Sequence, residues 1–117
     1  MSFKFERIII WQKAMVLGEQ IQQLSALFPK KERYNLTQQI TRAADSIALN
    51  IAEGSISQSN PEFRRFVGYA IRSLAEVVTC LLKARHRSYT SDSNIDELYN
   101  DCYHLMNMMV TFKRNIR

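Results

Sequence analysis

The sequence of 117 residues has few residues that interrupt regular structure, with only three glycines and two prolines. This scarcity favours a small number of long helices over a fold of many short segments. The longest early apolar run, Ile8-Ile9-Ile10-Trp11, is too short to span a membrane or to form the core of a signal peptide. Because no targeting segment is visible, we expect a cytoplasmic protein with no membrane partner.

The sequence also lacks the local patterns that mark most catalytic and metal sites. Its two cysteines, Cys80 and Cys102, have no metal-ligand spacing and are expected to be free thiols. Neither His86 nor His104 has a glutamate three residues before it, so the Glu-x-x-His elements of a di-metal bundle are missing. The glycines are scattered, which excludes a glycine-rich phosphate loop, and no nucleophile elbow surrounds any serine. We therefore predict a non-catalytic protein without a cofactor or a metal.

Apolar residues recur at helical spacing in four blocks. The blocks extend from Ile8 to Phe28, from Leu36 to Gly54, from Phe63 to Leu81 and from Ile95 to Ile116. An apolar content of 46% is typical of a globular domain with a packed core. Short connections force neighbouring helices to run antiparallel. The sequence therefore predicts an all-α fold, a single antiparallel up-down-up-down four-helix bundle that spans residues 1–117 as one domain.

The predicted helix ends carry signals of different strength. Gly54 is placed for a left-handed cap at the end of the second helix. Asn60 can cap the third helix, with Pro61 at its first position. Ser93 and Asp96 form a plausible capping pair at the start of the fourth. The second helix has the weakest start signal, so its first residue is predicted only to within several positions.

The third helix has a wider apolar arc than one stripe requires. Ile71 and Leu82 flank its main row of apolar residues. Two interpretations account for this arc. Either the third helix is buried deeply in the centre of the bundle, or part of the arc is a subunit interface.

Three segments of the sequence resemble a known family. They are Trp11-Gln12-Lys13-Ala14, the stretch from Arg42-Ala43-Ala44 to Asn50-Ile51-Ala52-Glu53-Gly54, and Ser73-Leu74-Ala75-Glu76. Together they resemble the four-helix-bundle family that is encoded in intervening sequences of bacterial large-subunit ribosomal RNA genes. The resemblance covers most of residues 3 to 87 and weakens over the fourth helix.

The resemblance implies a basic four-helix bundle that assembles into rings, commonly pentamers, so we expect a homo-oligomer. Related accessory proteins of diversity-generating retroelements bind nucleic acid and a reverse transcriptase. RNA or DNA and a protein partner are therefore the expected partners. One position differs, because Arg72 stands where many members have glycine. Close packing of a neighbouring backbone is not expected at that position.

A row of polar residues is a candidate for a site inside the bundle. Five of them share one face of the second predicted helix, and a glutamate of the antiparallel third helix can approach them. The set is Gln39, Arg42, Ser46, Asn50, Glu53 and Glu76. The row is either a ligand-binding or metal-binding site or a hydrogen-bonded structural seam between helices or subunits. The missing Glu-x-x-His elements favour the seam, with Arg42 and Glu76 as charge partners.

The net charge of +5 is concentrated at one end of the predicted bundle. The predicted topology brings together the start of the first helix, the connection between the second and third helices, and the end of the fourth. This end carries seven cations and three carboxylates, a net charge of +4. We call this end of the bundle the basic end. Its seven cations are Lys4, Arg7, Arg64, Arg65, Lys113, Arg114 and Arg117.

Helix dipoles explain only part of the basic end. Its three cations in the fourth helix lie at a helix end, where the dipole favours positive charge. The other four lie near helix starts, where each is disfavoured by about 0.3–1 kcal/mol if exposed. Those four are therefore the better candidates for phosphate contacts. Phe3, Phe5 and Phe63 lie close to them in the predicted bundle and can stack on bases, although helix packing is the favoured role for all three.

The sequence supports two non-catalytic functions. In the first, the oligomer binds RNA or DNA phosphates at the basic end without strong sequence preference. In the second, it is a structural or adaptor protein whose ring recruits a protein partner, and the charge only keeps it soluble. A pull-down treated with nuclease separates the two, because only partners held by nucleic acid would be lost.

Overall fold

The chain forms four α-helices and two short 3-10 helices, with no strand. A computed structural model describes all residues, 1–117. The elements, in chain order, are η1 (Lys4–Arg7), α1 (Ile9–Ser25), η2 (Lys30–Glu32), α2 (Leu36–Ser55), α3 (Asn60–His86) and α4 (Asp92–Asn115). The predicted all-α fold is confirmed.

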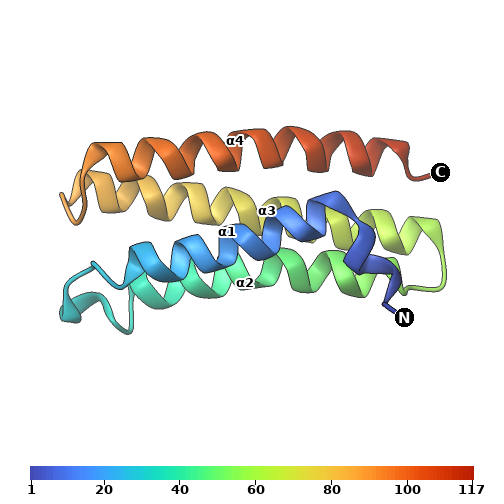
Figure 1. Ribbon diagram of the computed structural model, residues 1–117, viewed down its shortest axis with the longest axis horizontal. Helices are drawn as coiled ribbons and strands as arrows, with labels where there is room; N and C mark the ends of the chain where they lie inside the picture. The colour runs from blue at the N-terminus through green and yellow to red at the C-terminus, as the bar shows by residue number, and fades with distance from the viewer.

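Successive helices run in opposite directions along the long axis of the molecule (Figure 1). α1 contacts α2 and α4, and α3 contacts the same two helices, whereas the diagonal pairs α1–α3 and α2–α4 do not meet. The bundle is 43 Å long. This matches the 27 residues of α3 at a rise of about 1.5 Å per residue. The chain therefore adopts the predicted up-down-up-down arrangement.

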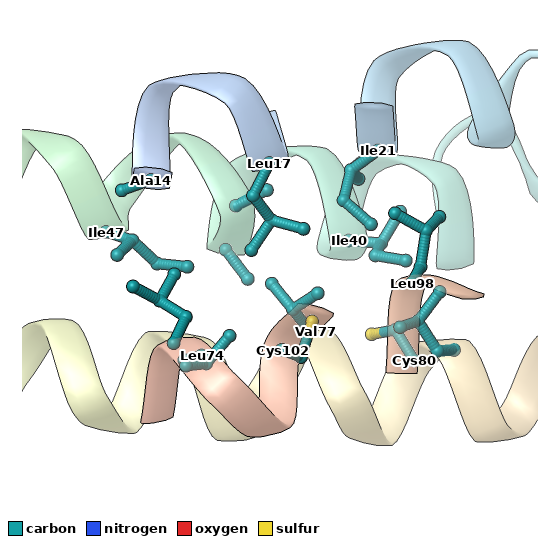
Figure 2. Packing of buried hydrophobic residues seen from close by; sticks show 14 of the residues in the cluster. Ala14, Leu17, Ile21, Ile40, Ile47, Leu74, Val77, Cys80, Leu98 and Cys102 are labelled. Carbon is teal, nitrogen blue, oxygen red and sulfur yellow. The ribbon is translucent and has the colours of Figure 1, made fainter. Parts of the chain in front are cut away.

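The core forms where the apolar stripes of the four helices meet, in one cluster of 24 buried residues. Figure 2 shows Leu17 and Ile21 of α1 and Ile47 of α2 directed across the bundle toward Leu74 and Val77 of α3. All five side chains are at most 2% exposed. Burying each contributes about 1.5–3 kcal/mol. None of the helices has both the length and the apolar composition needed to cross a membrane.

The wide apolar arc of α3 is only partly buried. Ile71 is half-buried and packs against the core. Leu82 is 42% exposed on the outside of the helix. Deep burial therefore accounts for one side of the arc, and the subunit-interface interpretation of the other side stays a prediction.

The caps of α3 and α4 lie one and two residues before the predicted positions. Ser59, and not Asn60, caps α3, because its hydroxyl accepts a backbone N–H of the first turn at 3.3 Å. Ser91, and not Ser93, caps α4 in the same way at 3.2 Å. Both stretches are rich in capping residues. In each case a serine just before the predicted capping residue accepts a hydrogen bond from the unpaired backbone N–H groups of the first helical turn.

Gly54 lies within the last turn of α2 and does not form the predicted left-handed cap, since no glycine has a positive φ. A Cβ at this position would lie 2.7 Å from the Cβ of Phe66 and 2.9 Å from the Cδ1 of Phe63. A glycine is therefore needed for the close approach of α2 to α3. The cap prediction was wrong because packing, and not backbone conformation, requires glycine here.

A buried carboxylate joins the two turns at the other end of the bundle. Glu32 is 6% exposed. It accepts hydrogen bonds from the hydroxyl of Tyr89 at 2.5 Å, from Arg87 at 3.1 Å and from the side-chain amide of Asn35 at 2.9 Å. It also accepts the backbone N–H of Leu36 at 3.4 Å. This last bond explains the weak start signal of α2, because the acceptor lies four residues before the helix.

Tyr89 reaches Glu32 because α3 ends in a tight turn. Ser88 has a φ of 58°, in the left-handed region. The backbone N–H of Tyr89 donates to the carbonyl of Ala84 at 3.0 Å, as in a Schellman motif. Placing serine in this conformation costs about 1–2 kcal/mol.

Replacing Gly54 by alanine should destabilise the fold by about 1–3 kcal/mol, because the added methyl group overpacks the contact between α2 and α3. The matched controls are Gly18→Ala and Gly68→Ala, where the nearest atoms lie 3.6 Å from an added Cβ. These changes should stabilise the helices by about 0.5–1 kcal/mol. Urea unfolding measures the free energy of all three variants. A Gly54→Ala protein as stable as the controls would contradict the requirement for close approach.

Glu32 should make the stability of the fold depend on pH. The hydrogen bond from Tyr89 is the main reason why the pKa of Glu32 lies below its usual value of 4.5, although burial acts in the opposite direction. A carboxyl that is more acidic in the folded chain stabilises the fold above its unfolded pKa. That stabilisation is lost as the pH falls through the folded pKa.

Glu32→Gln should therefore lower the midpoint of thermal unfolding at neutral pH. The difference from the wild type should shrink as the pH falls below the usual value of 4.5. Glu97→Gln is the control, because Glu97 is exposed and makes no ion pair. Equal midpoints for the wild type and Glu32→Gln at neutral pH would show that the buried carboxylate does not hold the turns together.

Candidate nucleic-acid interface

Three segments that are far apart in the sequence meet at one end of the bundle. The N-terminal segment, the turn between α2 and α3, and the end of α4 all lie at the right-hand end of Figure 1. Phe63 in the first turn of α3 connects them. Its ring centroid lies 5.6 Å from that of Phe112 in α4 and 6.0 Å from the Nζ of Lys4. The structure therefore brings together the segments that carry the seven predicted cations.

The cations of the basic end have no carboxylate partners. None of the seven has an acidic oxygen within 4.0 Å, since every ion pair of the chain lies elsewhere. Arg85 pairs with Asp92 and Asp96, and Arg87 pairs with Glu32, all at the opposite end. The two ends therefore differ in net charge, and also in that only the opposite end holds some of its cations in ion pairs.

The seven cations are not equally accessible. Arg64 and Lys113 are half-buried. The other five are exposed to solvent; they are Lys4, Arg7, Arg65, Arg114 and Arg117. The Cε of Lys113 lies 3.6 Å from the position of a Cβ on Gly68, so this side chain extends along α3. The exposed five can approach a ligand without breaking an ion pair.

Arg64 has a structural role that the sequence did not reveal. Its guanidinium donates a hydrogen bond to the carbonyl of Ile116 at 3.0 Å, just beyond the end of α4. Unpaired carbonyls and the negative pole of the dipole lie at such an end. Arg64 begins one helix but lies beside the end of its antiparallel neighbour. The favourable interaction of Arg64 with the end of α4 thus offsets its unfavourable interaction with the dipole of α3. Arg64 is therefore a weaker candidate for a phosphate contact than predicted.

The three aromatic residues near the basic end differ in exposure. Phe63 is half-buried and packs between helices. Phe5 is also half-buried, with its ring centroid 5.3 Å from that of Trp11. Phe3 is 67% exposed and stacks on Phe5 at 5.4 Å. The favoured packing role fits Phe63 and Phe5, and only Phe3 presents most of its ring to solvent.

The predicted polar row joins two helices at one point. The hydroxyl oxygens of Ser46 in α2 and Ser73 in α3 lie 2.6 Å apart, in hydrogen-bond contact. The side chain of Asn50 donates to the carbonyl of Ser46 at 2.8 Å, and that of Gln39 donates to Asn35 at 3.2 Å, so both bond locally.

The charged members of the row do not pair. Arg42 and Glu76 are exposed and form no ion pair with each other, so the predicted charge partnership is absent. Glu53 is also exposed. Arg72 points to solvent as well, so it does not interfere with packing inside the bundle. The interpretation as a structural seam between helices therefore rests on the bond of Ser46 to Ser73. A role of the exposed Arg42, Glu53 and Glu76 in a seam between subunits stays a prediction.

No group of three or more His, Cys, Asp and Glu side chains is placed to hold a metal ion. Cys80 and Cys102 are free, as expected, and both are buried in the core. Burial raises the pKa of Cys102 to about 12. A thiol with so high a pKa is a poor nucleophile at neutral pH.

A solved structure shares the fold. The crystal structure of a protein of unknown function from the S23 ribosomal protein family of Bacteroides thetaiotaomicron superimposes with a TM-score of 0.85. The match covers 92% of this chain and 100% of that one, at 18% sequence identity. At this identity the likeness shows the fold alone. No curated protein matches the sequence.

The family model described as 23S rRNA-intervening sequence protein matches residues 6–111. The match contains the three segments that resemble this family. It also continues beyond residue 87 through most of α4, where the resemblance alone was weaker. The chain therefore belongs to the 23S rRNA-intervening sequence protein family.

Proposed function

We propose that this protein is non-catalytic and binds the phosphate backbone of RNA or DNA through the exposed cations of the basic end. One observation carries the proposal. Seven cations from three segments lie at one end of the bundle, and none has a carboxylate within 4.0 Å. A cluster of unpaired Lys and Arg side chains is the electrostatic footprint expected of a nucleic-acid surface.

Two paired arginines at the opposite end support this assignment by contrast. There, the guanidinium groups of Arg85 and Arg87 are held by carboxylates of the same chain. A phosphate that approached them would have to compete with those carboxylates. At the basic end a phosphate meets no such competitor, and each contact releases counterions from the nucleic acid.

Removing one exposed cation from each segment should weaken binding and reduce its salt dependence. The variant is Arg7→Ala, Arg65→Ala and Arg114→Ala in one chain. For a single-stranded oligonucleotide, each lost phosphate contact lowers the slope of log affinity against log salt by about 0.7. The slope should therefore fall by about 2 units for three contacts. Fluorescence anisotropy at several salt concentrations measures this slope.

The matched control removes three exposed, unpaired cations from the other end, as Lys30→Ala, Lys31→Ala and Lys83→Ala. Both variants lose the same net charge. Binding that depends on the basic end leaves the control close to the wild type. Equal loss of affinity and slope in the two variants would mean that net charge, and not this surface, governs binding.

We also propose that the protein self-associates through an apolar face between α1 and α2. A groove of 460 Å³ lies on this face, and Trp11, Met15, Ala48 and Leu49 contribute to its lining. Met15 is 46% exposed and Leu49 is 60% exposed. Large apolar side chains grouped in this way on a surface are typical of protein–protein contacts.

Charge suggests which surface of a second copy would cover this groove. Glu19 and Asp45 line its edge, so a contact between two identical faces would bring like charges together. The outer face of α3 presents Arg72 and two exposed apolar side chains, Tyr69 and Leu82. Contact between two different faces is heterologous, and repetition of a heterologous contact forms a ring when the rotation between neighbouring copies closes. A ring would multiply the basic end and strengthen nucleic-acid binding by avidity.

Leu49→Glu should convert the oligomer to a monomer, because it places a charge in the apolar face. Leu27→Glu is the control, since Leu27 is 59% exposed but lies outside that face. Light scattering coupled to size-exclusion chromatography measures the mass of each protein. A monomeric wild type, or dissociation of Leu27→Glu alone, would rule out this interface.

A further inference from the structure

A groove begins within the basic end and continues between the first turn of α1 and the last turns of α4. It is a shallow groove of 680 Å³ that is largely open to solvent. Its apolar lining comes from Ile8, Ile9 and Ile10 on one side and from Met108 and Phe112 on the other. α1 and α4 make the least contact of the four neighbouring helix pairs, which leaves this seam open. We call it the α1–α4 groove.

The rim of the α1–α4 groove carries polar side chains on one face of α4. Asn107, Thr111 and Asn115 recur every four residues and are all exposed. None of these side chains takes part in the hydrogen bonds within the chain, so their donors and acceptors are open to a ligand. An asparagine amide offers both donors and acceptors. The groove thus combines an apolar floor with a hydrogen-bonding edge.

Positive charge adjoins the same groove. Arg7 contributes to its lining, and Arg114 flanks Asn115 in the sequence at the end of α4. Both arginines are exposed and have no carboxylate partner. A ligand that fits these features has an apolar face, a hydrogen-bonding edge and a negative charge within reach. An unpaired nucleotide has all three.

We propose that the α1–α4 groove receives a base of single-stranded nucleic acid while its phosphates contact Arg7 and Arg114. The inference rests on the proposed function and adds a preference for unpaired strands. The faces of a base would lie against Phe112 and the isoleucines, and its edge would meet the asparagine amides. In a duplex the bases are stacked and paired, so their faces are closed to the groove. The exposed cations alone would bind either form.

The test compares three RNA probes with the same number of phosphates: a single strand, the same strand with abasic positions, and a short duplex. The wild type should bind the intact strand about ten-fold more tightly than the abasic one, the scale expected for one stacked base. Asn107→Ala with Asn115→Ala should lower that ratio, because the hydrogen bonds to the base edge are lost while the apolar surface against the base faces remains. Its salt slope should stay unchanged, because no phosphate contact is lost.

Asn100→Ala is the control, since Asn100 is exposed on α4 but does not line this groove. Equal affinity of the wild type for intact and abasic strands would overturn the groove assignment and leave the basic surface standing. A base preference as large in the double variant as in the wild type would also overturn it. Absence of binding to all three probes would overturn the proposed function itself.

Discussion

The contact of Phe63 with its neighbours holds the basic end together. Its Cδ1 lies so close to Gly54 that only glycine fits there, and its ring meets the edge of Phe112 from α4. Lys4 of the N-terminal segment lies on the same ring. One side chain thus connects α2, α3, α4 and the N-terminal segment. Because α3, α4 and the N-terminal segment carry the cations, the shape of the charged surface depends on how closely α3 packs against α2.

The antiparallel arrangement gives the two ends of the bundle different uses of charge. Every helix start lies beside a helix end, so a cation such as Arg64 can stabilise a neighbour while it begins its own helix. At the other end, Glu32 accepts bonds from Arg87 and Tyr89 and so joins two turns, while the lysines of that end stay unpaired. At the basic end most cations make no such bond. These cations repel one another, and solvent and salt reduce that repulsion.

The helices and their arrangement could be predicted because apolar periodicity and short connections act locally. The capping residues were displaced by one or two positions, because Ser59 and Asn60, or Ser91 and Ser93, satisfy the same local requirement. Gly54 was assigned to a turn because a glycine needed for packing cannot be told from one needed for its φ without its neighbours. The position of the basic end could be predicted from the antiparallel order of the four helices.

Other features could not be predicted because they join distant residues. Glu32 and Tyr89 are 57 positions apart, and Arg64 and Ile116 are 52 apart. No local pattern marks either pair. The α1–α4 groove likewise depends on how far two helices separate, a distance that side-chain packing along the whole seam determines. Arg42 and Glu76 show the converse, because favourable chemistry on adjacent helices did not bring their side chains together.

The most direct measurement for the central claim is chemical footprinting of lysine and arginine side chains with and without a bound oligonucleotide, read by mass spectrometry. If the three segments form one nucleic-acid surface, Lys4, Arg65 and Arg114 should become protected together. Lys30, Lys31 and Lys83 at the opposite end should react as in the free protein. Protection of that opposite end, or protection spread evenly over both ends, would contradict a single basic surface.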